Sequence, residues 1–297
     1  MANLLNILVV GGGRLGATLA RDLAQTGQQL TVVVRQPQRA LAVSNWLKSH
    51  HLAANLIADL PTGTFDVVLA AVPDAQLVPL AQQLAKRPAL SPIYLHLSGV
   101  APARQLAHPS HAAVACGSLH PLAAVADPLN LRDPTSPLPG ALMAVGGDAP
   151  ALAMATQLSL LLGGLPQVVA DAQRPAYHAA AALIANDWVA LALAAEETVQ
   201  AAGLTHPGFR AGLLHLAKTA LAALQRVPAD TTLLVGLTGA VSRGDAETLT
   251  KHFKALQPDT AALHRQASQL LAERSAQLHR LSPEQLQKIT EVLRSIG

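Results

Sequence analysis

The sequence predicts an α/β chain in which a parallel β-sheet, covered by helices on both faces, is followed by an all-α region. Over residues 1–170, short apolar runs alternate with Ala/Leu-rich helical windows. Near-continuous apolar strands separated by helices are typical of a parallel sheet that is buried on both faces. After residue 170 the strand pattern largely ends. We therefore expect two domains, at 1–170 and 171–297.

The predicted strands are runs of aliphatic residues bounded by glycine, proline or polar residues. They are expected at 4–10, 29–35, 66–72, 93–98, 112–117, 141–145 and 167–170, with a weaker one at 55–57. The helical windows between them are expected at 14–27, 37–50, 74–87, 101–107 and 149–163. Helix and strand thus alternate through most of the first domain.

The second domain is predicted to begin with one long Ala-rich helix over 175–203, where Pro175 is acceptable in the first turn. Its most apolar stretch, 179–195, contains Asn186 and Asp187, which would be costly in lipid, so we expect a buried helix and no membrane span. Further helices are expected at 208–226, 245–256, 259–280 and 283–296, the last with Ser282 as its N-cap.

Composition excludes several classes of protein. Hydrophobic residues make up 51% of the chain and aromatic residues 2%, which indicates an aliphatic core. The net charge of +3 comes from scattered basic residues, so we expect no nucleic-acid surface. A single cysteine, Cys116, allows neither a disulfide framework nor a cysteine metal site. We expect a cytoplasmic protein, because the apolar start also lacks the basic region of a signal peptide.

A glycine-rich segment follows the first predicted strand and opens the first predicted helix. Gly11, Gly13 and Gly16 have the Gly-x-Gly-x-x-Gly spacing. In this pattern the first glycine makes a tight turn, the second lets the backbone approach a pyrophosphate, and the third lets the helix pack closely on the strand. The free N–H groups of the helix N-terminus favour the anion. The segment therefore predicts a Rossmann-type dinucleotide site.

The end of the second predicted strand indicates which dinucleotide is bound. An NAD site usually has Asp or Glu there, whereas this chain has Arg35, with Arg39 one turn later and Arg14 in the glycine loop. A guanidinium suits a 2′-phosphate, so the pattern favours NADP. The alternative is that these are ordinary surface arginines. The predicted cofactor-binding set is Gly11, Gly13, Arg14, Leu15, Gly16, Arg35, Arg39, Val72 and Pro73.

Candidate catalytic residues follow two later strands. Ser98 is the last residue of the run 93–98, and His120 follows the run 112–117. Open α/β sheets bind their ligands at the carboxyl ends of the strands, so both side chains should reach one edge of the sheet. There His120 could exchange a proton near neutral pH. The alternative is a histidine that only caps a loop.

Several segments resemble an uncharacterised bacterial family. They are Ser98-Gly99, Gly117-Ser118-Leu119-His120-Pro121-Leu122, Tyr177-His178-Ala179-Ala180, Asn186 and 237–245, where Ala240 stands in place of an expected proline. The resemblance spans nearly the whole chain. It implies an NADP-binding Rossmann-type domain followed by a helical domain related to 6-phosphogluconate dehydrogenase.

More distant likenesses suggest roles for individual residues. Ser98 and His120 are similar to the serine and His-Pro motifs of prephenate dehydrogenases, which implies that Ser98 orients a substrate oxygen and His120 is the acid/base. A likeness to pyrroline-5-carboxylate reductase is also expected. In the 6-phosphogluconate dehydrogenase superfamily the long helix lines the active site. Asn186 matches the amide found there, and His178 lies two turns earlier on the same face.

Together these observations predict an NADP-dependent oxidoreductase that acts on a small carbonyl, hydroxyl or imine metabolite in an interdomain cleft. The expected catalytic residues are His120, Ser98, His178 and Asn186. The expected substrate-binding residues are Ser98, His120, Asn186 and Arg243, whose guanidinium could clamp an anionic group. The alternative function is a non-catalytic NADP-binding sensor. We expect no metal, and we expect a homodimer, because the Ala/Leu-rich helices have more apolar surface than one chain can cover.

Overall fold

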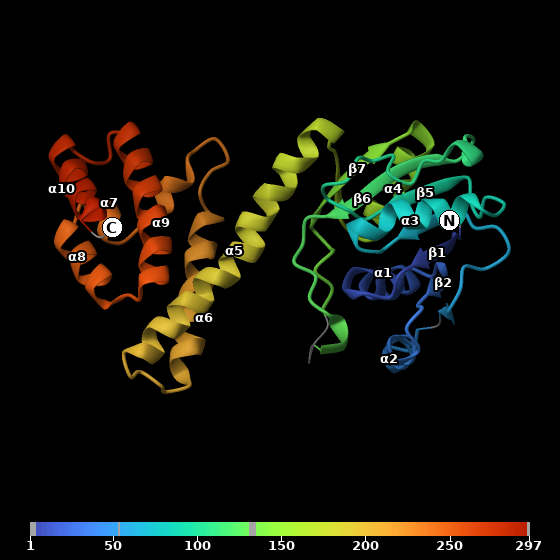
Figure 1. Cartoon of the computed structure of the whole chain (residues 1–297), viewed down its shortest axis with the longest axis horizontal. Helices are drawn as coiled ribbons and strands as arrows, with labels where there is room; N and C mark the ends of the chain where they lie inside the picture. Colours follow the sequence, from blue (N-terminus) through green and yellow to red (C-terminus); the bar gives the residue numbers. More distant parts are fainter. Residues whose placement is uncertain (1–3, 53, 131–134, 296–297) are drawn as a thin grey trace. The chain divides into compact units, whose positions relative to one another are not determined.

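The computed structural model describes residues 4–52, 54–130 and 135–295, which form two compact units, Met1–Ala185 and Asn186–Gly297 (Figure 1). The first unit contains every strand found among these residues. The sequence predicted a domain boundary at 170/171. The structure instead divides the chain into units inside a long helix, α5 (Arg174–Ala201), whose first twelve residues belong to the first unit.

The first unit is built on one sheet of eight strands in the order β3-β2-β1-β4-β5-β6-β7-β8. The strands are β1 (Asn6–Val10), β2 (Gln29–Val33), β3 (Asn55–Ile57), β4 (Val67–Ala70), β5 (Ile93–His96), β6 (Ala115–Pro121), β7 (Leu142–Gly147) and β8 (Leu165–Val168). All eight predicted strands are confirmed, with ends that differ by a few residues. The strand β1 lies between β2 and β4, so that Val9 pairs with Val32 on one side and Leu69 on the other.

One strand pair differs from the prediction of a parallel sheet. β6 and β7 pair antiparallel, with His120 opposite Ala144, whereas every other pair is parallel. A parallel pair needs a crossover, usually a helix, between its strands. The described part of the 122–141 connection contains only a short 3-10 turn, η3 (Pro128–Asn130), so the chain turns back beside β6 in the opposite direction.

Helices cover both faces of the sheet, as predicted. They are α1 (Arg14–Gln25), α2 (Pro37–Ser49), α3 (Leu77–Ala85, after the 3-10 turn η1, Asp74–Gln76) and α4 (Ala149–Leu161). Successive residues of β1 point to opposite faces. Ile7 and Val9 pack in the core with α1 and α4, and Leu8 and Val10 pack in the core with α3.

The helix predicted over 101–107 is absent. The segment instead forms separate turns, in which the Gln105 amide donates to the Pro102 carbonyl and the Ala107 amide to the Arg104 carbonyl. These bonds span three residues and are not continued into an α-helical ladder. The prediction failed because a segment of only seven residues gains too few helical hydrogen bonds to form a helix from an Ala-rich composition alone.

The second unit is all α, as predicted. After α5 come α6 (Gly208–Leu224), α7 (Ala240–Arg243), α8 (Ala246–Ala255), α9 (Pro258–Gln277) and α10 (Pro283–Arg294), with short 3-10 turns before α5 (η4, Asp171–Gln173) and α7 (η5, Leu233–Gly236). Ser282 caps α10 in a capping box with Gln285, which confirms the predicted helix start. Buried side chains of α7 to α10, among them Leu249, Phe253 and Ile289, form the core of this unit.

The long helix α5 is not buried as the sequence predicted. Within the described chain its only buried residue is Arg174, and apolar side chains such as Leu183, Ile184 and Val189 are exposed. The prediction failed because apolar composition indicates that the helix surface is buried against something. It does not show that the burying residues belong to the same chain. By length and composition, Asp171–Ala201 is the one described helix that could cross a membrane, a test that helices of soluble proteins also pass.

Candidate functional site

The glycine loop joins β1 to α1 at the carboxyl edge of the sheet. Gly11 has a φ of +116°, and a Cβ there would collide with the Ala71 carbonyl oxygen that follows β4. A Cβ on Gly16 would collide with the carbonyl oxygen of Gly11. A Cβ on Gly13, by contrast, would meet no atom within 4 Å. Two glycines therefore permit close packing, and the third leaves open space in front of the helix N-terminus.

A hollow of about 390 Å³ opens in front of this loop, and we call it the cofactor hollow. Of the predicted cofactor residues, those that line it are Gly11, Gly13, Arg35, Arg39, Val72 and Pro73. A second hollow, of about 500 Å³, is also lined by Arg35, together with residues that include Gln83, Lys86 and Arg87. Arg14, Leu15 and Gly16 stand outside the cofactor hollow, Arg14 exposed at the first position of α1.

The two arginines that follow β2 differ in what they bind. Arg39 is engaged: its Nε donates to the Gly12 carbonyl at 2.7 Å, and its Nη1 and Nη2 pair with the Asp127 carboxylate at 2.8 and 3.0 Å. The hydrogen bond from Arg39 lowers the pKa of Asp127. Arg35 is exposed and forms no hydrogen bond or ion pair with another described residue. Of the two, only Arg35 has a guanidinium left to bind a phosphate.

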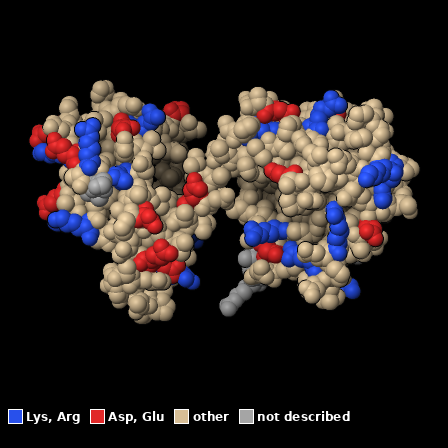
Figure 2. Space-filling view, in the orientation of Figure 1, with Lys and Arg blue, Asp and Glu red and all other residues tan. Residues whose placement is uncertain are grey.

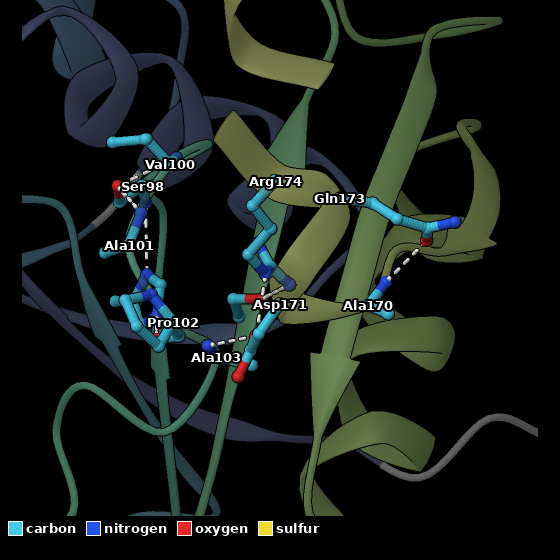
Figure 3. A network of polar contacts seen from close by, with 11 residues as sticks. Ser98, Val100, Ala101, Pro102, Ala103, Ala170, Asp171, Gln173 and Arg174 are labelled. Carbon is cyan, nitrogen blue, oxygen red and sulfur yellow. Dashed lines mark hydrogen bonds and ion pairs between the residues drawn. The ribbon is translucent and has the colours of Figure 1, made fainter. Parts of the chain in front are cut away.

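Ser98 lies in a tight turn after β5 (Figure 3). Its hydroxyl oxygen accepts from the backbone amides of Val100 at 3.3 Å and Ala101 at 3.0 Å, which leaves the hydroxyl hydrogen to donate. The buried His96 holds the turn from behind. Its Nε2 donates to the Pro102 carbonyl at 2.9 Å, and its Nδ1 accepts from the Ser98 amide at 3.2 Å.

His120 is half-buried near the end of β6, two residues past the last pair between β5 and β6. Its Nδ1 lies 2.8 Å from the Tyr177 hydroxyl, and its ring centre lies 5.8 Å from that of His178. A Cβ on Gly99 would lie 2.9 Å from Nε2 of His120 and 2.7 Å from Nδ1 of His178. The turn after β5, the end of β6 and the first turn of α5 thus bring these side chains together within the first unit.

The environment of His120 changes its expected chemistry. Burial lowers its pKa to about 4, and the charges of His178 and Arg174 act in the same direction. The sequence predicted a proton exchange near neutral pH. At that pH the ring is neutral, so it donates a hydrogen bond through one nitrogen and accepts through the other.

Known families and folds match most of the chain. Residues 7–128 match the family model of ketopantoate reductase PanE/ApbA, and residues 141–271 match a domain of unknown function, DUF2520. A provisionally assigned NADP oxidoreductase from Bacteroides fragilis is 18% identical over 91% of this chain and 98% of its own, with a TM-score of 0.73. The chain has the fold of Rossmann-type oxidoreductases.

Two further structures share this fold. A pyrroline-5-carboxylate reductase from Coxiella burnetii is 16% identical over 93% of this chain and 99% of its own, with a TM-score of 0.57. A reductive aminase from Aspergillus terreus, solved with NADPH and ethyl-5-oxohexanoate, is 20% identical over 97% and 99%, with a TM-score of 0.56. The predicted resemblance to an uncharacterised family and to pyrroline-5-carboxylate reductase is confirmed. No curated protein sequence matches the chain.

Two residues of this site were missing from the predicted set. Arg174 is fully buried. Its Nη2 donates to the Ser118 hydroxyl, and its Nε pairs at 3.1 Å with Asp171, whose Oδ1 also accepts from the Ala103 amide (Figure 3). Its Nη1 has no partner among the described residues. The other is Tyr177, and its position directly before His178 in the family motif was the one available signal.

The remaining predicted residues belong to the second unit. Asn186 is exposed on α5, eight residues after His178. Arg243 is exposed at the end of α7, before Gly244 (φ +70°) and Asp245, which caps α8 by accepting from the Thr248 amide at 2.9 Å. Substrate contacts of Asn186 and Arg243 stay predictions, as does the interdomain cleft.

Proposed function

We propose that the chain is an NADP-dependent oxidoreductase that moves a hydride between NADP(H) and a small carbonyl, hydroxyl or imine compound. The observation that carries this proposal is a shared edge of the sheet. The cofactor hollow opens where β1 and β4 end, Ser98 follows the end of the neighbouring strand β5, and His120 lies near the end of the next strand, β6. Ligands of open α/β sheets bind at this edge, where the direction of the strand order reverses.

NADP is preferred to NAD because of the charges at the end of β2. Arg35 lines the hollow with an unengaged guanidinium, and no acidic residue follows β2 to accept from the ribose hydroxyls. A guanidinium beside a 2′-phosphate gains a charge-assisted hydrogen bond. The fold relatives agree with this choice, since one is described as an NADP oxidoreductase and another was solved with NADPH.

The roles of the catalytic residues follow from their hydrogen bonds. The cofactor supplies the hydride. The Nε2 edge of His120 faces Gly99 and binds the reacting oxygen or nitrogen of the substrate, and the Ser98 hydroxyl hydrogen gives that atom a second donor. His178, exposed at the edge of this cluster, is the third polar group of the first unit near the substrate. Asn186 and Arg243 are proposed to complete the substrate contacts.

We further propose that the protein works in the cytoplasm as a homodimer. Large apolar side chains of α5 and α6 are exposed, and a mainly apolar hollow of about 570 Å³ lies among residues of α6, η5 and α9. On the face shown in Figure 2, much of the surface around the described charged residues is uncharged. Exposed apolar surface of this extent is typical of a protein–protein interface. We take a second copy of the chain as the partner, because most soluble oligomers are built from identical chains.

Calorimetric titration tests the cofactor, and turnover tests the chemistry. NADP(H) should bind more tightly than NAD(H), and a screen of small carbonyl, hydroxyl and imine compounds should show oxidation or formation of NADPH. His120→Asn should lower turnover by roughly 10²–10⁴-fold without changing NADP affinity. Tight NADP binding without any turnover would favour the non-catalytic sensor. Failure to bind either nucleotide would reject both functions.

A further inference from the structure

His120 and Tyr177 form a hydrogen-bonded pair in which Tyr177 has no role so far. The Tyr177 hydroxyl lies 2.8 Å from Nδ1 of His120, and the two rings meet edge to face at 5.6 Å and 88°. Both side chains are half-buried. Tyr177 comes from the first turn of α5 and His120 from β6, so the bond connects two elements that are far apart in sequence.

The direction of this hydrogen bond can be inferred from the chemistry of the two groups. A neutral imidazole nitrogen accepts well, and a phenol is a good donor. Burial raises the pKa of Tyr177, which keeps the phenol protonated. Tyr177 therefore donates to Nδ1 of His120, and the ring proton stays on Nε2. That nitrogen is the one that faces Gly99, where a Cβ would approach it to 2.9 Å.

We propose that Tyr177 is the positioning residue of the site: it holds His120 in the tautomer with the proton on Nε2 and replaces that proton through Nδ1 during the reaction. The inference rests on the proposed function, because it assigns the proton path of that same site. It also explains why position 99 is glycine. Any larger residue would cover the nitrogen that must reach the substrate.

The Tyr177 hydroxyl supplies the second proton that a neutral His120 needs when it protonates the substrate. When the substrate carbonyl carbon accepts a hydride from reduced pyridine nucleotide, the carbon–oxygen π bond breaks and the oxygen takes the proton from Nε2 of His120. Alone, the ring would become an imidazolate. Instead Nδ1 takes the proton of the Tyr177 hydroxyl as that O–H bond breaks, which leaves a neutral ring and a tyrosinate. After the product leaves, water gives a proton to Nε2, and Nδ1 returns its proton to the tyrosinate, which restores the starting tautomer and leaves hydroxide to the solvent.

Charges around the pair favour this path. The buried Arg174, one turn before Tyr177 on the same helix, stabilises a tyrosinate and disfavours a charged His120. The other titratable groups that act on His120 are His178 on α5, His96 on β5 and Asp74 after β4, of which only Asp74 favours the charged ring. The net effect of these charges favours a neutral His120, which passes a proton from Tyr177 at Nδ1 to the substrate at Nε2.

Nitrogen NMR of histidine-labelled protein tests the tautomer without any substrate. The His120 signals, assigned by their loss in His120→Asn, should show a protonated Nε2 and a bare Nδ1 at pH 7. In Tyr177→Phe, which keeps the ring and removes the hydroxyl, the single tautomer should give way to a mixture. Turnover should fall by roughly 10–100-fold, with unchanged KM and NADP affinity.

The chain provides a matched control, since Tyr94 is its other tyrosine. The Tyr94 hydroxyl accepts from the Leu90 amide at 3.1 Å, away from the site, so Tyr94→Phe should keep both the His120 tautomer and turnover. A wild-type His120 with its proton on Nδ1 would overturn the proposal. So would a Tyr177→Phe variant with an unchanged tautomer and normal turnover. If the tautomer is as expected but His120→Asn is fully active, His120 is not the acid/base. The proposed function then fails on that point, independently of the tautomer.

Discussion

The two units of the chain cover their apolar surface to different extents. In the first unit, strands and helices bury two large aliphatic clusters on opposite faces of one sheet. In the second, the buried cluster comes from α7 to α10, while neither α6 nor the part of α5 after Ala185 contributes a buried residue in the described chain. The first unit thus completes its own core. The second leaves α6 and its own part of α5 without cover from the same unit.

This difference shows where each part of the function is specified. The cofactor hollow and the His120 cluster lie within the unit that is complete by itself, where rigid strands can hold their geometry. The exposed helices form the proposed dimer interface, and α5, which starts beside His120, carries much of that exposed surface. Changes to α5 and α6 should therefore alter the oligomer first and the site only indirectly.

The largest expected effect is on assembly. Val189 on α5 and Leu216 on α6 are each 65% exposed, and a glutamate in place of either would place a charge in the proposed interface. The wild type should run as a dimer in light scattering, and Val189→Glu with Leu216→Glu should run as a monomer. Leu41→Glu, at a 63% exposed leucine of α2, is the control and should stay dimeric. A monomeric wild type would contradict the proposal that a second copy covers α5 and α6.

The next effect is on cofactor binding. Gly13→Val should abolish NADP binding, because a branched side chain would fill the space before the α1 N-terminus, while the fold should survive since no atom lies within 4 Å of the new Cβ. Circular dichroism and calorimetry measure the two results. Gly212→Val, at a similarly open glycine of α6, should leave binding intact. Tight binding by Gly13→Val would place the nucleotide elsewhere.

The third effect links His120 to stability. Its pKa is about 4 in the folded protein and 6.5 in the unfolded chain, so the unfolded state binds more protons between these values. The stabilisation is complete above pH 6.5 and is lost as the pH falls towards 4, a change of up to about 3 kcal/mol in the free energy of unfolding. Urea titrations over this range should show a smaller loss for His120→Asn. Equal losses for both proteins would contradict the lowered pKa.

The smallest effect separates the two arginines of the cofactor hollow. Arg35→Ala should weaken NADP binding by about 1.5–3 kcal/mol and NAD binding hardly at all, since only NADP carries the 2′-phosphate. Arg39→Ala removes the bridge from Asp127 to the Gly12 carbonyl and should weaken both nucleotides alike. Calorimetry on both cofactors distinguishes them. Equal losses of NADP and NAD in Arg35→Ala would reject the phosphate contact.

Much of the fold could be predicted from local sequence patterns. Aliphatic runs located all eight strands, and the box of Ser282 and Gln285 located the start of α10, because such signals depend on neighbouring residues. The antiparallel direction of β7 could not be predicted, since it depends on how the long 122–141 connection turns. The exposure of α5 could not be predicted either, since apolar composition does not say which chain covers it.

The site was predicted to a similar extent. Gly11, Gly13 and Arg35 could be placed at the cofactor hollow from the sequence, because their positions are tied to strand ends and a fixed spacing; their contacts with the cofactor stay predictions. Arg39 was assigned to the phosphate, but it is engaged by Asp127, which lies 88 residues away and gives no local signal. Tyr177 and Arg174 were missed for the same reason. Their partners, His120 and Ser118, lie on β6 and meet them only in the folded chain.

The antiparallel pairing of β6 with β7 has a consequence for variation in this protein. Because of it, β6 runs past the end of β5, and His120 is held by a backbone ladder on one side, opposite Ala144, instead of by a loop. The connection 122–141 can then change in length or sequence without moving the imidazole. What such changes would disturb is Asp127, and with it the support of the glycine loop. Natural variants and engineered insertions in this segment should alter nucleotide affinity before they alter proton transfer.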